Sequence, residues 1–210
     1  MIYIDYKTIR QVAHGEFTVK KSRFIGYISP VKTEYQAETF INKIKKENYN
    51  ATHNVSAYIL RENGTKRYSD DGEPQGTAGV PVLDVLEKEK IVDVAVVVTR
   101  YFGGILLGAG GLVRSYSKGA KLAVDAGEII VMRQCSVFSV EMDYSFYGIA
   151  MQIVEKSGCK ILSSDFTDIV TLTIMLPSKK NAELLYQFKE QSSATVNPLH
   201  MRDEYAEMDI

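Results

Sequence analysis

The chain has 210 residues, of which 45% are apolar and 24% are charged. This composition is ordinary for a soluble globular protein and excludes an intrinsically disordered chain. Its longest apolar runs, such as Val94–Val98, are far shorter than the roughly 18 residues that a membrane-spanning helix needs, and the N-terminal segment lacks the pattern of a secretory signal. Two cysteines, Cys135 and Cys159, cannot form a disulfide framework or a four-ligand zinc site alone. We therefore expect a cytoplasmic protein without a membrane partner.

Charge is distributed unequally along the chain, although its total is close to zero. Residues 1–134 carry 19 Lys and Arg against 15 Asp and Glu, a net charge of +4, whereas residues 135–210 carry 6 against 11, a net charge of −5. A change of sign between the halves indicates two units with different partners, the first of which is better suited to an anionic one. A charge of +4 permits binding to nucleic acid without requiring it.

The first half shows alternating strand and helix signals. Thr33 and Gln36 have the spacing of a capping box, and apolar residues at helical spacing follow them, which predicts a helix. The segment Ser69–Pro81 is too rich in Gly, Pro and Asp to be regular, and a short helix is expected over Leu83–Lys90. Stretches rich in β-branched and aromatic residues predict strands over Arg10–Lys20, Arg23–Val31, Val55–Leu60, Lys66–Ser69 and Asp93–Arg100.

A glycine-rich stretch and a long helix complete the first half. Five of the chain's 15 glycines lie between Gly103 and Gly111. The helix after them has an apolar stripe at helical spacing, formed by Leu112, Tyr116, Ala120 and Ala123. Gly127 stands where the C-terminus of this helix would favour a residue in the left-handed conformation.

The second half has a simpler pattern. Its predicted order is strand, helix, strand, strand, helix and strand, over Ser136–Met142, Phe146–Lys156, Lys160–Phe166, Ile169–Leu176, Lys179–Glu190 and Thr195–Arg202. Ser145 is expected to cap the first of these helices and Gly158 to end it. This βαββαβ order is that of a ferredoxin-like unit, with both helices on one face of the sheet. We expect an α+β protein with two domains, residues 1–134 and 135–210.

The glycine cluster is the feature that most strongly indicates binding, because successive glycines before a helix let backbone N–H groups converge on an anion. It is neither a Walker loop, since Ala109 replaces the lysine, nor a dinucleotide motif, since Val113 replaces the third glycine. Arg100 before it and Arg114 after it favour contact with an anion or an RNA backbone at one shared opening. The alternative is that the glycines only allow close packing of helix on strand. In either case we expect Gly110 to occupy a tight or left-handed position, where valine would be damaging.

Three carboxylates, Asp70, Asp71 and Glu73, follow the predicted hairpin. They would hold Mg²⁺ or act in acid–base chemistry, form turns and helix caps, or pair with nearby arginines. His53 is expected to be a hydrogen-bonded structural residue. The pattern contains no complete catalytic constellation, so no catalytic residue, metal or cofactor is assigned.

Four segments together resemble the YigZ/IMPACT family. They are SRFIGYISPV (22–31), ATHNVSAYIL (51–60), SDDGEPQGTAGVP (69–81) and VVVTRYFGGILLGAGGLVRSYSKGAKLA (96–123). For the first domain, the resemblance implies a β-α-β sandwich like that of a ribosomal small-subunit protein and of galactokinase-type kinases. For the second, it implies a small domain similar to the last domain of elongation factor G. The eukaryotic relatives regulate translation.

The resemblance also implies an anion-binding cleft. Its expected residues are Arg67, Asp70, Asp71, Glu73, Thr77, Arg100, Gly103, Gly104, Gly108, Gly110 and Arg114. Lys118, one helical turn after Arg114, would extend the contact along a nucleic-acid backbone.

Two functions remain from the sequence. The first is a non-enzymatic, translation-linked regulatory protein that contacts RNA or a ribosome-associated factor through this cleft. The second is an enzyme that acts on a phosphorylated small molecule or nucleotide there, with one of the three carboxylates as metal ligand or base. The missing P-loop lysine and the lack of a nucleophile–base pair favour the first.

Overall fold

The computed structural model describes residues 5–208 and divides the chain into two compact units. The first consists of Tyr6–Ile130, and the second mainly of the residues from Val131 onward. The long strand β7 (Ile129–Met142) runs from one unit into the other, so the residues at which we expected the domain boundary, 134 and 135, lie inside this strand. Both units combine an antiparallel sheet with helices, so the chain is an α+β protein.

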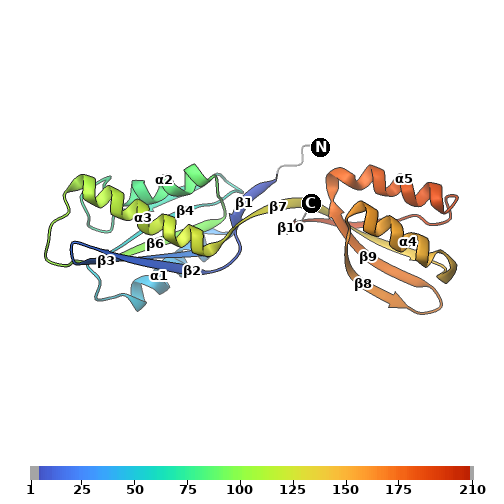
Figure 1. Ribbon diagram of the computed structural model, residues 1–210, viewed down its shortest axis with the longest axis horizontal. Coiled ribbons are helices and arrows are strands. Elements are labelled where there is room, and N and C mark those ends of the chain that lie inside the picture. The colour runs from blue at the N-terminus through green and yellow to red at the C-terminus, as the bar shows by residue number, and fades with distance from the viewer. Residues whose placement is uncertain (1–4, 209–210) are drawn as a thin grey trace. The chain divides into compact units, whose positions relative to one another are not determined.

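The first unit is built on one five-stranded antiparallel sheet with helices on both faces (Figure 1). The strands, in spatial order, are β2 (Ala13–Val19), β3 (Ser22–Pro30), β6 (Val94–Tyr101), β4 (His53–Ile59) and β5 (Lys66–Ser69). One face carries α2 (Gly79–Glu89) and α3 (Ala109–Gly127), and the other carries α1 (Glu34–Glu47). A short strand, β1 (Tyr6–Ile9), comes before these strands in the sequence and is hydrogen-bonded to β7.

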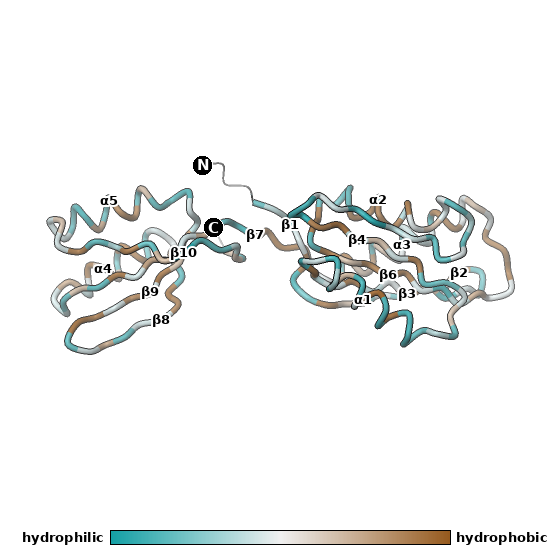
Figure 2. The backbone as a smooth tube through the Cα atoms, turned by 180° about the vertical axis from the view of Figure 1, so that it is seen from behind, coloured by the Kyte–Doolittle hydropathy of each residue, from teal (hydrophilic) through white to brown (hydrophobic). Residues whose placement is uncertain are grey.

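The apolar pattern of the sequence explains this layering. The side chains of Val94, Val96 and Val98 on β6 are fully buried in the core beneath α2 and α3, whereas Ala95 packs in a second cluster beneath α1. The predicted apolar stripe of α3 is confirmed, since its four residues are at most 6% exposed. Figure 2 shows hydrophobic residues along β4 and β6, whereas much of α1 is hydrophilic.

Two glycines let α3 lie directly on the sheet. A Cβ atom at Gly26 of β3 would lie 2.0 Å from the carbonyl oxygen of Gly119, and a Cβ atom at Gly119 would lie 2.8 Å from a methyl group of Val98. Any side chain at either position would push the helix away. This close contact sets how near α3 lies to the sheet.

The second unit has the βαββαβ element order that the sequence predicts. Its sheet order is β10 (Leu199–Glu207), β7, β9 (Val170–Pro177) and β8 (Lys160–Phe166). Its helices are α4 (Tyr144–Ser157) and α5 (Asn181–Gln191), the latter preceded by the short 3-10 turn Ser178–Lys180. The inward face of β9 is formed by four fully buried residues, Val170, Leu172, Ile174 and Leu176.

Several expected boundaries were wrong. Helix α4 begins at Tyr144 after Asp143, without a side-chain cap, so Ser145 is not the capping residue. Helix α2 begins at Gly79 rather than Leu83, because the distant carboxylate of Asp70 accepts hydrogen bonds from its first N–H groups. The last strand is Leu199–Glu207 rather than Thr195–Arg202, since pairing with β7 selects its residues.

The expectation for Gly127 was also wrong. The left-handed residue after α3 is Glu128, with φ 59°, whereas Gly127 is the last residue of the helix itself. A Cβ atom at Gly127 would lie 3.1 Å from Ile28 and 3.3 Å from Ile9. Glycine is therefore needed there for packing against the sheet and β1, not for backbone conformation. In the part of the chain that the structure describes, no helix is long and apolar enough to cross a membrane.

Candidate functional site

Four side chains form a row across one end of the first sheet, on the face covered by α2 and α3. Phe17 pairs with Phe24 on neighbouring strands, Phe24 with Arg100, and Arg100 with His53. The two phenyl rings are stacked at 5.3 Å. Tyr116 of α3 meets Phe24 edge to face at the same centroid distance. The row is therefore aromatic at the β2 side and polar at the β4 side.

The polar end of the row is a buried ion pair. Arg100 Nη1 donates to Glu73 Oε1 at 2.6 Å, and the two side chains are only 6% and 4% exposed. The Tyr116 hydroxyl donates to the same oxygen at 2.7 Å. Burial and this contact with Glu73 raise the pKa of Tyr116 well above its usual range. His53 Nε2 lies 3.8 Å from Glu73. Arg100, which we expected in an open anion-binding cleft, thus lies inside the core with its charge balanced by Glu73.

The other two carboxylates of the acidic cluster are also held by the protein. Asp70 Oδ1 accepts from the N–H groups of Ala78 and Gly79, and its Oδ2 accepts from Gly76 N–H. Asp71 binds Lys45 Nζ at 2.6 Å and accepts from Asn54 N–H at 2.7 Å. These contacts favour the interpretation of the three carboxylates as turn formers, helix caps and ion-pair partners. Within residues 5–208, no group of three or more His, Cys, Asp or Glu side chains is placed to hold a metal ion.

His53 is a hydrogen-bonded residue, as expected: its Nδ1 lies 2.8 Å from the carbonyl oxygen of Asp71. Thr77 closes a local turn, because its hydroxyl donates to the carbonyl oxygen of Pro74 at 2.6 Å. Arg67 is exposed on β5, where its guanidinium donates to the carbonyl oxygen of Lys66. Each of these three side chains therefore forms a hydrogen bond with a backbone carbonyl oxygen of the protein.

The glycines of the β6–α3 loop have different roles. A Cβ atom at Gly103 would lie 2.0 Å from the backbone of Lys21, so this residue packs against the turn between β2 and β3. Gly104 and Gly108 have left-handed φ angles of 82° and 68° and face open space. The expectation for Gly110 was wrong, because it is an ordinary helical residue whose Cβ atom would meet only Arg114 Nη1, at 3.5 Å.

A hollow of about 310 Å³, here called the basic hollow, lies beside the first turns of α3. It is lined by Phe17, Thr18, Val19, Lys20, Leu107, Gly111, Arg114, Ser115 and Lys118. Three of these residues are cationic and none is a carboxylate. Arg114 and Lys118 were expected at the site. Lys20 was not, although its position before a second lysine between two predicted strands is a visible signal of an exposed basic turn.

The three cations of the basic hollow have no carboxylate partner among the described residues. No carboxylate oxygen of the described residues lies within 4.0 Å of the charged groups of Lys20, Arg114 or Lys118, whereas Arg100 and Lys45 are paired. Lys118 Nζ lies 4.5 Å from the centroid of Phe17, the aromatic end of the row. Such a cation–π contact holds the ammonium group over the Phe17 ring. The hollow therefore presents uncompensated positive charge.

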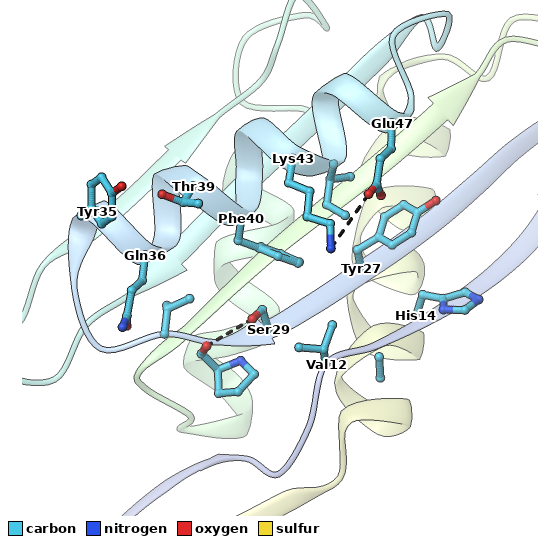
Figure 3. Close-up of a pocket in the computed structure, with 14 residues that line it drawn as sticks. Val12, His14, Tyr27, Ser29, Tyr35, Gln36, Thr39, Phe40, Lys43 and Glu47 are labelled. Atoms are coloured by element: carbon cyan, nitrogen blue, oxygen red, sulfur yellow. Dashed lines mark hydrogen bonds and ion pairs between the residues drawn. The ribbon is translucent and has the colours of Figure 1, made fainter.

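A larger cavity, of about 550 Å³, lies between α1 and β3 on the opposite face of the sheet (Figure 3). Its lining includes Tyr27, Tyr35 and Phe40, with Lys43 and Glu47 on α1. These last two residues are 3.9 Å apart and balance one another's charge. No pattern in the sequence predicted this cavity, and its lining does not favour an anion.

The second unit has a polar cluster without the arrangement of a catalytic triad. Asp203 Oδ1 accepts from the Ser136 hydroxyl at 2.6 Å and lies 2.9 Å from His200 Nε2. The carboxylate therefore stands between hydroxyl and imidazole, whereas a nucleophilic serine needs the imidazole beside it. Burial raises the pKa of Cys159 to about 11 and also raises that of Cys135, which disfavours the reactive thiolate.

Comparison with known proteins identifies the family. The sequence matches the Impact N-terminal domain over residues 20–124. It is 46% identical over 145 residues to the IMPACT family member YvyE of Bacillus subtilis, covering 69% of this chain and 67% of that protein. It is 31% identical over 191 residues to the IMPACT family member YigZ of Escherichia coli, covering 88% of this chain and 92% of the relative.

A solved structure has a similar fold. It is titled "Crystal structure of an hypothetical protein", is 28% identical, and aligns with a TM-score of 0.61 over 97% of this chain and all of that one. The family resemblance of the four sequence segments is thereby confirmed. From the domain match and the length over which its bacterial relatives align, we conclude that this chain belongs to the IMPACT family.

Proposed function

We propose that this protein is a non-enzymatic, translation-linked regulatory protein of the cytoplasm that contacts RNA through the basic hollow. The observation that carries the proposal is the set of three cations, Lys20, Arg114 and Lys118, which line one concavity without a carboxylate. Uncompensated charge in a concave site raises the local concentration of anions. In complexes of proteins with nucleic acids, Lys and Arg side chains commonly bind the phosphate groups of the backbone.

Binding is favoured over catalysis by how the polar side chains are used. Asp70, Asp71 and Glu73, the carboxylates that an enzyme would need as base or metal ligand, all accept hydrogen bonds from protein donors. Ser115 lines the hollow, but its lining contains no histidine or carboxylate to activate the hydroxyl. A phosphate-binding surface needs neither group.

The link to translation comes from the family resemblance, since the eukaryotic relatives regulate translation. We extend to this chain the domain relationships that the resemblance implies, to a ribosomal small-subunit protein for the first unit and to elongation factor G for the second. The sheet order β10–β7–β9–β8, with βαββαβ connectivity, supports the second relationship. A ribosome-associated RNA is therefore the partner that we propose.

The test is the substitution Arg114→Ala, with RNA affinity measured by fluorescence anisotropy over a range of salt concentrations. Losing one phosphate contact should weaken binding similarly for all RNA sequences and reduce the salt slope by about one unit. Because Arg114 is exposed and has no ion-pair partner, the melting temperature should not change. Lys88→Ala, which removes an exposed cation of α2 outside the hollow, is the matched control. Unchanged affinity together with a lowered melting temperature would contradict the proposal and make Arg114 a structural residue.

A further inference from the structure

The basic hollow carries more positive charge than one internal phosphate of an RNA strand can balance. An internal phosphodiester has a single negative charge, whereas a terminal phosphate monoester carries about −1.5 to −2 near neutral pH. Three cationic residues and no carboxylate line this one small space. Their number matches a dianionic group better than a monoanionic one.

Contacts within the first unit show where two of the cationic groups lie. Lys118 Nζ lies 4.5 Å from the centroid of the Phe17 ring, and both residues line the hollow. The guanidinium of Arg114 points back toward the start of α3, because its Nη1 lies 3.5 Å from the position that a Cβ atom of Gly110 would take. The first turn of this helix has no side-chain cap, so its free N–H groups lie next to that guanidinium. An anion there would receive hydrogen bonds from Arg114 and backbone together.

The shape of the hollow favours the end of a ligand rather than a continuous strand. Its volume of about 310 Å³ is near the lower limit of pockets that hold small molecules. Apolar parts of Phe17, Val19 and Leu107 complete its lining, and they provide surface for a ribose or a base edge. A Cβ atom at Gly111 would lie 3.0 Å from Leu107 Cβ, so the glycine lets Leu107 pack closely against the start of α3.

We infer that the basic hollow binds the terminal phosphate monoester of a nucleotide, either at the end of an RNA strand or as a free mononucleotide. The inference rests on the proposed function, because it assigns the same three cations to a particular kind of phosphate. Arg114 is the residue that we expect to contact the terminal phosphate, since a guanidinium donates two parallel hydrogen bonds to phosphate oxygens. The second negative charge of a monoester strengthens this contact relative to an internal phosphodiester.

The experiment compares three labelled RNA oligonucleotides of one sequence, ending in a 5′-hydroxyl, a 5′-phosphate or a 3′-phosphate, by fluorescence anisotropy with the full chain. We expect one phosphorylated end to bind about tenfold more tightly than the hydroxyl-ended RNA. Adenosine 5′-monophosphate and inorganic phosphate are used as unlabelled competitors. The mononucleotide should remove the tenfold preference at lower concentration than inorganic phosphate does, because it also contacts the apolar wall.

Three variants locate the preference. Arg114→Gln should abolish the preference for the phosphorylated end, and Arg114→Lys should retain part of this preference. Lys88→Gln should leave the preference unchanged, because Lys88 lies on α2 outside the hollow. Thermal melting of each variant establishes that it is folded. Loss of the preference in Arg114→Gln with an unchanged melting temperature supports the inference.

Failure of the inference is distinguishable from failure of the proposed function. Equal affinity of the wild-type chain for all three RNA ends would overturn the terminal-phosphate inference and leave RNA binding intact. Binding of adenosine 5′-monophosphate without binding of any RNA would support the phosphate chemistry and overturn the RNA function. Absence of binding to every probe would overturn both.

Discussion

Arg100 Nη1 donates to Glu73 Oε1 across 2.6 Å, so the central strand of the first unit is tied to the loop between β5 and α2 inside the core. Both residues had been candidates for an open anion site. Their burial gives the loop between β5 and α2 a structural role, since Asp70 and Asp71 bind backbone N–H groups and Glu73 binds Arg100 of the sheet. Lys20, Arg114 and Lys118 of the basic hollow remain exposed.

Glu73→Ala should destabilise the protein by about 3–5 kcal/mol, because it leaves the Arg100 guanidinium buried without a carboxylate. The free energy of unfolding, measured by urea denaturation, checks this. Glu62→Ala, at an exposed position of the turn after β4, is the control and should change stability by less than about 0.5 kcal/mol. A loss of under about 1 kcal/mol for Glu73→Ala would show that the ion pair is not needed.

Gly103→Ala and Gly110→Ala should have opposite effects, although both glycines belong to the same motif. A methyl group at Gly103 would lie 2.0 Å from the backbone of Lys21, so the loop or the β2–β3 turn must shift. The free energy of unfolding should fall by about 1–3 kcal/mol, and the melting temperature should fall by several degrees. At Gly110 the methyl group has room, and alanine in a helix is favoured by up to about 1 kcal/mol. Calorimetry of the two variants would contradict this if Gly110→Ala proved the more damaging.

Asp203 should make the stability of the protein depend on acid pH. Hydrogen bonds, first from the Ser136 hydroxyl and then from His200, lower the pKa of Asp203 below its ordinary value of 3.8. The folded state therefore favours the ionised carboxylate, so this contribution is complete above the unfolded pKa and is lost as pH falls through the folded one.

Asp203→Asn should accordingly reduce the free energy of unfolding at pH 7, and the difference from wild type should shrink as the pH is lowered below 3.8. Urea denaturation at a series of pH values measures this. Asp143→Asn, at an exposed residue whose side chain makes no cap hydrogen bond, is the matched control. A difference that grows toward low pH would contradict the assigned direction.

We propose that the second unit folds independently, and the structure indicates where it must be cut. Residues Glu204–Glu207 of β10 pair with residues 132–135 of β7, so a fragment that begins at residue 136 loses these partners. Residues 131–210 should therefore show a cooperative thermal transition at a higher temperature than residues 136–210. Non-cooperative melting of the longer fragment, followed by circular dichroism, would show that the two units depend on each other for folding.

Local patterns in the sequence predicted much of the secondary structure, because neighbouring residues determine it. The β-branched run of β6 and the apolar stripe of α3 needed only the periodicity of buried positions. The cap of α1 was also predictable, since Gln36 N–H donates to Thr33 Oγ1 at 3.2 Å, three residues away. The start of α2 was not, because its first N–H groups are bound by Asp70, eight and nine residues earlier.

The sequence by itself determined the family, the α+β class and the presence of arginines on both sides of a glycine-rich turn. Only the tertiary structure decided which arginine is available to a ligand. Arg100 and Arg114 look equivalent in the sequence, but the first is neutralised by a carboxylate 27 residues away, whereas the second stays exposed beside Lys20 and Lys118. The availability of a charge depends on burial and on long-range partners, and no local pattern of residues encodes either.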